Sequence, residues 1–231
     1  NLHTNGGVFN FGHRAPELVQ ALRDGLGQVD IGNHHLPSAR RARLAARLTR
    51  TFPARLSRVC FTPSATEATD FVVRLARAAT GRRRVVAVDG GFHGTTGVGA
   101  HLGDERFVAW AEPRSAEVTR VRRWDLDAMA QALAAGDVAV VLAETVQASS
   151  GMHLPPPGYY PTLAELCRDA GVPLVLDEVQ TGWGRTGKLW AFEHFGVVPD
   201  AVILGKGMTG GLYPMAGCVY DPRLAERLER D

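Results

Sequence analysis

Two ionisable residues of the chain each follow a short apolar run, and together they suit one kind of chemistry. Residues 173–176 are apolar and end at Asp177, and residues 201–204 are apolar and end at Gly205-Lys206-Gly207. A lysine amine forms a Schiff base with an aldehyde, and a carboxylate keeps a ring nitrogen protonated so that the ring accepts electrons. A lysine and a carboxylate at neighbouring strand ends are what pyridoxal phosphate chemistry requires.

The two runs must be placed by strands for this chemistry to be possible. Both have the length and the branched composition of buried parallel strands. The ligand crevice of an open α/β sheet lies beyond the carboxyl ends of its strands, so we expect Asp177 and Lys206 in one site. A third apolar strand is predicted over residues 138–142 and leads to Glu144.

A strand followed by a helix start has the pattern of an anion site. Residues 58–61 predict a strand that runs through a tight turn into a helix over residues 67–80. Free backbone N–H groups and the helix dipole converge at such a helix start. Ser64, Ala65 and Thr66 are the expected donors, and the alternative is that Ser64 or Thr66 only caps the helix.

Another predicted strand, residues 85–88, is followed by the turn Asp89-Gly90-Gly91-Phe92-His93-Gly94. Glycines around one aromatic residue let its ring lie against a flat ligand, whereas Phe92 alone could equally belong to the core. We include Phe92 and His93 among the candidate cofactor-binding residues.

The remaining predicted elements complete an alternation of strands and helices. A loop or short hairpin is expected over residues 1–12, an edge strand over residues 107–110 and a strand over residues 215–220. Helices are predicted from Pro16 up to the glycines at 25 and 27, after Ser38 with Leu44 and Leu48 inward, and over residues 125–135, 162–169 and 224–230. The alternation indicates a three-layer α/β fold with a mostly parallel central sheet and helices on both faces.

Composition and charge narrow the function classes. Hydrophobic residues make up 45% of the chain and charged residues 22%, which is ordinary for a globular protein and argues against disorder. The 26 basic and 24 acidic residues give a charge of +2, too balanced to argue for a nucleic-acid or membrane partner. We interpret the local clusters, residues 40–43 and 82–84, as solvated helix and loop faces.

The cysteine spacing and the hydropathy of the sequence indicate in which cellular compartment the protein is expected. Cys60, Cys167 and Cys218 have the spacing of neither a disulfide framework nor a zinc site, so no metal is expected. No window approaches 18 apolar residues, and the first residues lack the basic head and apolar run of a secretory signal. We therefore expect a cytoplasmic protein.

Five segments, in the family's order, resemble the class III aminotransferases, which are pyridoxal phosphate enzymes of fold type I. The group includes acetylornithine, ornithine and 4-aminobutyrate aminotransferases. The longest matching segment is LVLDEVQTGWGRTGKLWAFEHFGVVPDAVILGKGMTGG, residues 174–211. The others are GHRAPELVQAL from residue 12, FTPSATEATDFVVRLAR from residue 61, FHGTTG from residue 92 and ETVQASSG from residue 144.

The resemblance implies a role for individual residues. Lys206 would form the Schiff base and shuttle the proton, and Asp177 would pair with the pyridine nitrogen. Ser64, Ala65 and Thr66 would hold the phosphate of the cofactor. Phe92 and Val179 would lie against the two faces of its ring, Gln180 would lie near the phenolic oxygen, and Glu144 near the edge of the cofactor.

The resemblance also implies a division of the chain. Residues 51–231 would form the large domain of the aspartate aminotransferase-like fold, which binds the cofactor. Residues 1–50 would lie at the active-site and dimer side. The family continues into a smaller C-terminal domain, which is expected to be absent here, and a partner subunit completes the phosphate site. A homodimer, or completion by another chain or domain, is therefore expected.

The predicted function is transfer of an amino group between an amino acid or amine and a 2-oxo acid or aldehyde. Ser149 stands where the ornithine and 4-aminobutyrate enzymes carry a glutamate, which leaves donor and acceptor open. The alternatives are a racemase or decarboxylase on the same scaffold and a catalytically incomplete cofactor-binding fragment. A nucleotide-binding ATPase does not fit, because Lys206 lacks the preceding glycine spacing and the following Ser or Thr of a phosphate loop.

Overall fold

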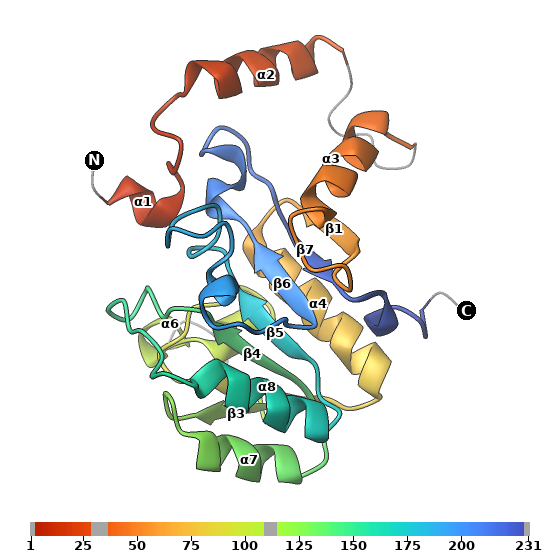
Figure 1. Ribbon diagram of the computed structural model, residues 1–231, viewed down its shortest axis with the longest axis vertical. Coiled ribbons are helices and arrows are strands. Elements are labelled where there is room, and N and C mark those ends of the chain that lie inside the picture. Colours follow the sequence, from red (N-terminus) through yellow and green to blue (C-terminus); the bar gives the residue numbers. More distant parts are fainter. Residues whose placement is uncertain (1–2, 29–36, 109–114, 229–231) are drawn as a thin grey trace.

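One seven-stranded sheet forms the centre of the protein (Figure 1). The computed structural model describes residues 3–28, 37–108 and 115–228. The strands are β1 (Arg58–Thr62), β2 (Arg84–Val88), β3 (Val118–Val121), β4 (Val138–Glu144), β5 (Leu174–Asp177), β6 (Ala201–Leu204) and β7 (Ala216–Tyr220). Their order across the sheet is β1-β7-β6-β5-β4-β2-β3.

The sheet is mostly parallel, as predicted. The pairs β2–β3, β2–β4, β4–β5 and β5–β6 are parallel, while β7 runs antiparallel to both β1 and β6. The carboxyl ends of the parallel strands therefore meet at one edge, where Glu144 of β4 pairs in register with Asp177 of β5. This edge is the place that the fold offers to a ligand.

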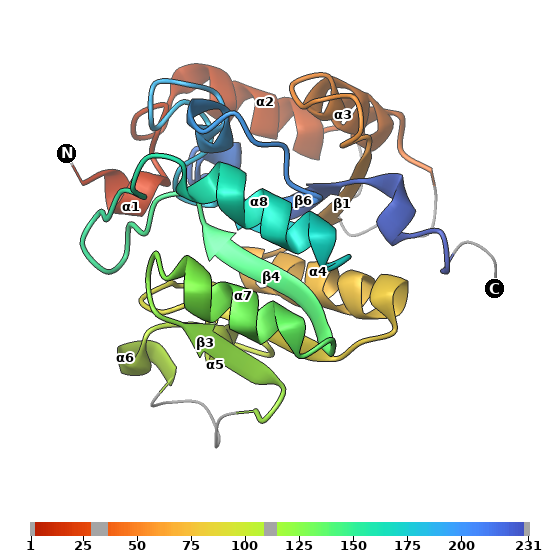
Figure 2. The same cartoon turned by 60° about the horizontal axis from the view of Figure 1, so that its bottom comes forward.

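Helices lie on both faces of the sheet, which gives the three layers (Figure 2). The α-helices are α1 (Thr4–Gly7), α2 (Pro16–Leu26), α3 (Ala39–Thr49), α4 (Ala65–Thr80), α5 (Gly99–Leu102), α6 (Glu105–Val108), α7 (Leu126–Ala134) and α8 (Tyr159–Asp169). Three short 3-10 helices follow, η1 (Ala191–His194), η2 (Lys206–Thr209) and η3 (Pro222–Leu224). Within the described residues, no helix has both the length and the apolar character needed to cross a bilayer.

Successive strand residues feed two separate hydrophobic cores. Val85 and Val140 pack with α4 on one face, whereas their neighbours Val86 and Val141 pack with α7 and α8 on the other. This follows from the alternation of side chains along a strand. Every residue of β4 is buried, so this central strand has no solvated side, and its residues before Glu144 form one continuous apolar run.

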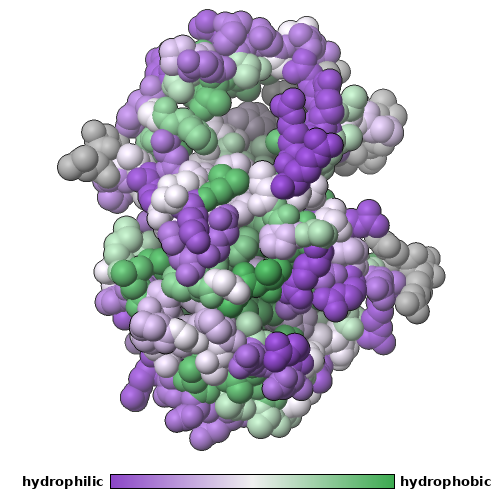
Figure 3. All heavy atoms as spheres, viewed as in Figure 1, coloured by the Kyte–Doolittle hydropathy of each residue, from purple (hydrophilic) through white to green (hydrophobic). Residues whose placement is uncertain are grey.

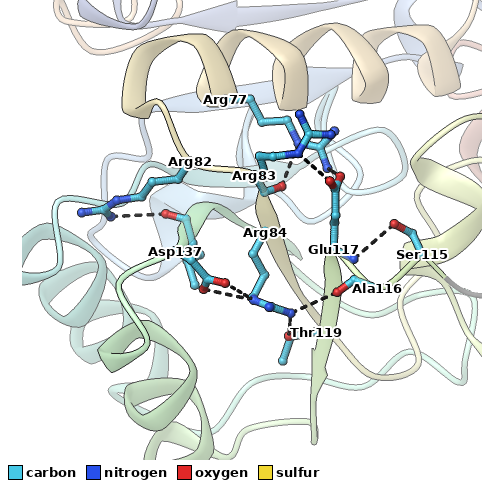
Figure 4. A network of polar contacts seen from close by, with 10 residues as sticks. Arg77, Arg82, Arg83, Arg84, Ser115, Ala116, Glu117, Thr119 and Asp137 are labelled. Atoms are coloured by element: carbon cyan, nitrogen blue, oxygen red, sulfur yellow. Dashed lines mark hydrogen bonds and ion pairs between the residues drawn. The ribbon is translucent and has the colours of Figure 1, made fainter.

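The arginine triplet at the start of β2 is engaged within the chain (Figure 4). The Arg83 Nε atom lies 2.5 Å from Glu117 Oε1, and the Arg84 Nε atom lies 2.8 Å from Asp137 Oδ2. Arg82 donates to the main-chain oxygens of residues 138 and 170, each at 3.2 Å. These contacts tie together the amino-terminal ends of β2, β3 and β4, so the cluster serves the fold.

Several predicted elements differ from the structure. Phe107 and Val108 end helix α6 and do not form an edge strand, and residues 109–110 lie outside the described chain. The edge strand is β3, which the sequence analysis missed. Residues 4–7 form a helical turn, where a loop or hairpin was expected.

Two predicted helices have different ends. Helix α8 begins at Tyr159, three residues before the predicted start, because Pro161 fits the first turn of a helix, where an N–H group has no helical partner. The charged helix predicted from residue 224 is wrong for residues 224–228. Asp221 caps the short helix η3, which ends at Leu224, and turns follow.

Helices α2 and α3 carry apolar side chains that the described chain leaves uncovered. α2 stands away from the sheet (Figure 1) and has no buried residue. Leu48 of α3 is buried as predicted, but Leu44 is 38% exposed, which corrects its predicted inward position. Hydrophilic residues cover the outer side of α2 and α3, and apolar residues gather on the side of α2 that faces the molecule (Figure 3).

Candidate active site

One cavity at the carboxyl edge of the sheet is lined by all ten candidate residues. Its volume is about 590 Å³. The residues come from four strand ends and one helix start, and they are Ser64, Ala65, Thr66, Phe92, His93, Glu144, Asp177, Val179, Gln180 and Lys206. The structure therefore brings together every residue that the sequence analysis singled out.

Asp177 ends β5 and is held in a fixed orientation. It is 5% exposed. Its Oδ2 atom lies 2.9 Å from Nδ1 of His93, and its Oδ1 atom accepts the backbone N–H of Val179 at 3.0 Å. His93 is itself buried, and its Nε2 atom has no hydrogen-bond partner among the residues that the structure describes. A carboxylate with one partner on each oxygen has little freedom to rotate.

Lys206 follows β6 in a backbone conformation that favours glycine, with φ of +42°. Its Nζ atom donates to Oε1 of Gln180 at 2.9 Å. Burial lowers the pKa of Lys206, and the charges of Asp177 and Glu144 act in the opposite direction. The amine is therefore more readily neutral than an exposed lysine, which is the state in which a lysine acts as a nucleophile or base.

The glycines beside Lys206 have close neighbours. A Cβ atom at Gly205 would lie 3.2 Å from Ala65 Cβ and 3.3 Å from Val179 Cγ1. A Cβ atom at Gly207 would lie 2.8 Å from Asn10 Nδ2 and 3.2 Å from Trp183. The backbone around Lys206 thus packs closely against its neighbours, and a side chain at either glycine would require them to shift.

Glu144 ends β4 beside Asp177 and is 6% exposed. Its Oε1 atom accepts the backbone N–H of Phe92 at 2.7 Å, and its Oε2 atom accepts the N–H of Ala148 at 3.2 Å. Burial raises the pKa of Glu144 to about 7, and the nearby Asp177 charge adds to this rise, while His93 and the two N–H donors oppose it. The carboxyl group therefore changes its charge near neutral pH.

The start of α4 forms the opposite part of the cavity wall. Ser64 is the N-cap, and its Oγ atom accepts the backbone N–H of Glu67 at 3.4 Å, so this side chain caps the helix. The first N–H groups of an α-helix have no helical partner, which leaves Ala65 and Thr66 suited to an anion. Gly94 lies against this start, because a Cβ atom there would be 2.1 Å from Thr66 Oγ1.

Sequence reasoning missed part of the wall. Beyond the ten candidates, the lining residues are Val8, Pro63, Thr69, Gly94, Thr95, Ser149 and Thr209 together with the segment 211–216. Val8 lies in a stretch predicted as a loop or short hairpin, and the sequence analysis assigns no role to residues 211–214. Nearness in sequence to Lys206 could have indicated Thr209 and the segment 211–216, but it says nothing about the N-terminal Val8.

The cavity fits a flat, phosphorylated cofactor by its size and by the chemistry of its walls. Its volume of about 590 Å³ falls in the usual range for small-ligand sites, roughly 300–1,000 Å³. A buried carboxylate, a lysine of lowered pKa and a helix start line the same space, and they complement a ring nitrogen, an aldehyde and a phosphate. Among the described residues, no three His, Cys, Asp or Glu side chains are grouped as metal ligands would be.

Comparison with known proteins places the chain among aminotransferases. Residues 4–230 match the family model described as aminotransferase class-III. An "uncharacterized aminotransferase" of Archaeoglobus fulgidus is 45% identical over 218 residues, which are 94% of this chain and 51% of that protein. Acetylornithine aminotransferase of Methanopyrus kandleri is 37% identical over 222 residues, which are 94% of this chain and 56% of that protein.

A solved structure shows the same fold. Ornithine aminotransferase from Toxoplasma gondii, described with partial occupancy of pyridoxal phosphate at its active site, superposes with a TM-score of 0.91 at 23% identity. The match covers 98% of this chain and 55% of that one. The chain spans about half the length of the curated relatives it matches.

Proposed function

Because the chain belongs to the class-III aminotransferase family, we propose that it is the cofactor-binding part of an enzyme that uses pyridoxal phosphate to move an amino group. The donor would be an amino acid or amine, and the acceptor a 2-oxo acid or aldehyde. The observation that carries this proposal is that Asp177 and Lys206, from neighbouring strand ends, line one cavity. The similarity to an uncharacterized aminotransferase and to an acetylornithine aminotransferase favours amino transfer over a racemase or decarboxylase on this scaffold.

Each candidate residue has a task toward the cofactor in this proposal. Asp177 would hold the ring nitrogen, and the backbone of Ser64, Ala65 and Thr66 would hold the phosphate. Phe92 and Val179 would lie against the ring, and Glu144 with His93 would bound its edge. When bound, pyridoxal phosphate supplies an aldehyde that condenses with amines and a ring that withdraws electrons from the substrate carbon.

Lys206 and Gln180 would handle the proton. Nζ of Lys206 would accept the proton released from the substrate carbon, a task for which the lowered pKa of this lysine prepares it. Gln180 orients the amine, because its Oε1 atom accepts from Nζ at 2.9 Å.

We also propose that the site is completed outside the described chain, by a second copy in a homodimer or by another part of a longer polypeptide. The exposed apolar side chains of α2 and α3, Leu26 at 55% and Leu44 at 38%, support this. Three free cysteines suit the reducing cytoplasm, which we propose as the compartment. A full-length protein that is monomeric at assay concentration and fully active would contradict the dimer.

Trapping of the cofactor on Lys206 tests the function. The full-length protein is incubated with pyridoxal phosphate, reduced with borohydride and digested. The mass of the peptide that contains Lys206 is then measured by mass spectrometry. We expect the added mass on Lys206 in the parent protein and none in Lys206→Ala. A panel of amines and 2-oxo acids then tests for a carbonyl product, and an absent adduct in the parent protein would reject the proposal.

A further inference from the structure

A buried carboxylate with four donors lies directly behind the candidate active site. Glu178 is 0% exposed. Its Oε1 atom accepts from Thr145 Oγ1 at 2.9 Å and from the backbone N–H of Phe192 at 2.7 Å. Its Oε2 atom accepts from Thr181 Oγ1 at 2.6 Å and from the backbone N–H of Ala191 at 3.0 Å. No cation is among these four partners.

The two hydroxyl donors are chain neighbours of cavity residues. Thr145 follows Glu144, and Thr181 follows Gln180. Glu178 itself lies between Asp177 and Val179. Glu144, Asp177, Val179 and Gln180 line the cavity, whereas Thr145, Glu178 and Thr181 do not.

The same hydrogen bonds also hold the segment that connects β5 to β6. Ala191 and Phe192 are the first two residues of η1, so Glu178 ties the start of this helix to the end of β5. Glu178 N donates to Ile203 O at 2.9 Å, which joins the same residue to β6, the strand before Lys206. One side chain therefore connects the ends of β4 and β5 with η1.

We propose that Glu178 is a positioning residue, whose carboxylate sets the backbone at Asp177, Val179, Gln180 and Glu144 in the geometry that the cofactor needs. It touches neither cofactor nor substrate and acts through its neighbours. The inference rests on the proposed function for its effect on cofactor binding, although the network itself can be tested without the cofactor.

The geometry predicts that glutamine cannot replace this residue. Each carboxylate oxygen accepts one hydroxyl and one backbone N–H. A hydroxyl can rotate to suit an amide NH₂ group, but a backbone N–H can only donate. Whichever way the amide of Glu178→Gln is turned, its NH₂ group meets the N–H of Ala191 or Phe192, and one buried donor stays unpaired.

Glu193→Gln is the matched control. Glu193 is the third residue of η1 and accepts the N–H of Trp190 at 3.0 Å through Oε1, but its side chain is exposed. An exposed glutamine can keep its oxygen on that N–H and turn its NH₂ group to water. The same substitution in the same short helix therefore leaves the network intact.

The first measurement is hydrogen exchange of the full-length protein without cofactor. We expect the amides of Ala191 and Phe192 to exchange at least about tenfold faster in Glu178→Gln, since an unpaired buried donor is costly, and at the parent rate in Glu193→Gln. Parent-like exchange at both amides in Glu178→Gln would overturn the network.

The second measurement is the dissociation constant for pyridoxal phosphate. We expect affinity about tenfold or more weaker in Glu178→Gln, because small displacements of positioned groups have effects of this size or larger, and unchanged in Glu193→Gln. Thr145→Val and Thr181→Val each remove one hydroxyl donor and are expected to weaken binding by a smaller factor, so they test the inference if Glu178→Gln does not fold.

The outcomes separate this inference from the proposed function. A parent protein that does not bind the cofactor rejects both. A parent that binds it with the same affinity as Glu178→Gln and the two threonine variants rejects the positioning role alone.

Discussion

The Nδ1 atom of His93 lies 2.9 Å from Oδ2 of Asp177, although the two residues are 84 positions apart in the chain. The His93 side chain is 0% exposed and that of Asp177 5%. The second oxygen of Asp177 accepts the N–H of Val179, so His93 provides the contact that comes from outside the local turn. His93 therefore positions the carboxylate from the loop that follows β2.

Removal of the imidazole is expected to weaken cofactor binding. His93→Leu leaves Oδ2 of Asp177 without its partner in a buried site, at a cost of about 1.5–3 kcal/mol for a charged group, or roughly tenfold or more in affinity. In His93→Asn the amide nitrogen can take the place of Nδ1, so binding should be partly retained. Equilibrium dialysis with pyridoxal phosphate measures both, and equal affinity of His93→Leu and the parent would contradict the assignment.

Glu144 makes the stability of the cofactor-free protein depend on pH. Burial raises the pKa of Glu144 from 4.5 to about 7 in the folded protein. Between these values the unfolded chain has lost the proton that the folded protein keeps, so the free energy of unfolding falls as pH rises through this window and the loss is complete above about 7. The expected decline is on the order of 3 kcal/mol.

Urea unfolding at a series of pH values from 4 to 8 checks this slope. The side chain in Glu144→Gln cannot ionise. The free energy of unfolding of this variant should therefore fall less with pH than that of the parent. Its unfolding free energy carries a constant offset, because its NH₂ group faces the N–H of Phe92 or Ala148. Burial lowers the pKa of Lys206 below its value of 10.5 in the unfolded chain. Lys206 therefore makes the free energy of unfolding rise with pH as the pH approaches 10.5. A parallel decline in parent and variant would exclude Glu144 as its source.

Substitution of Gly94, compared with that of a glycine in open space, tests whether the position lacks room for a side chain. Its φ is +122°, and an added Cβ atom would lie 2.1 Å from Thr66 Oγ1 and 2.7 Å from Thr66 Cβ. Gly136 also has positive φ, at +75°, with nothing within 4 Å of an added Cβ atom. Gly136→Ala should therefore cost about 1 kcal/mol for backbone strain alone, and Gly94→Ala should cost ~1–3 kcal/mol more because Thr66 must move.

Thermal and urea unfolding of the two variants give the comparison, and cofactor affinity adds a second measure. Thr66 belongs to the first turn of α4, so its displacement in Gly94→Ala should also weaken binding of pyridoxal phosphate, and Gly136→Ala should not. Equal losses of stability in the two variants would show that Gly94 is not packed against α4 as described.

The candidate site could be found from the sequence because its residues obey a local rule. An ionisable residue at the end of a buried parallel strand lies at the ligand edge of the sheet whatever the order of strands. Asp177, Lys206 and Glu144 each follow such a strand. They meet in one cavity because β4, β5 and β6 are adjacent in the sheet, an order that the structure shows.

Features that depend on contacts distant in sequence could not be found in this way. No pattern around His93 indicates that its ring reaches Asp177. Strand β3 is short and only its last residue is buried, so its sequence lacks a strong apolar period. Leu44 was placed inward by helical periodicity, which identifies an apolar face but cannot say whether the same chain covers it.

The N-terminal segment offers a last prediction. Arg185 Nη2 donates to Thr4 Oγ1 at 2.6 Å and also to Asn10 Oδ1. These contacts hold residues 4–10 against the loop that carries Gln180, where a Cβ atom at Gly6 would lie 3.7 Å from Gln180 Nε2. Val8 of the same segment lines the cavity. Arg185 therefore helps to hold part of the cavity wall in place, although it does not line the cavity itself.

Arg185→Met is expected to loosen this segment with little effect on global stability. The side chain is exposed, so the free energy of unfolding should change by less than about 1 kcal/mol. Hydrogen exchange at Phe9, whose N–H donates to Thr4 O at 3.1 Å, should become faster, because local opening precedes global unfolding. Lys188→Met removes an exposed cation that donates to Glu193 O, away from the N-terminal segment. Identical exchange at Phe9 in the two variants would show that Arg185 does not hold the segment in place.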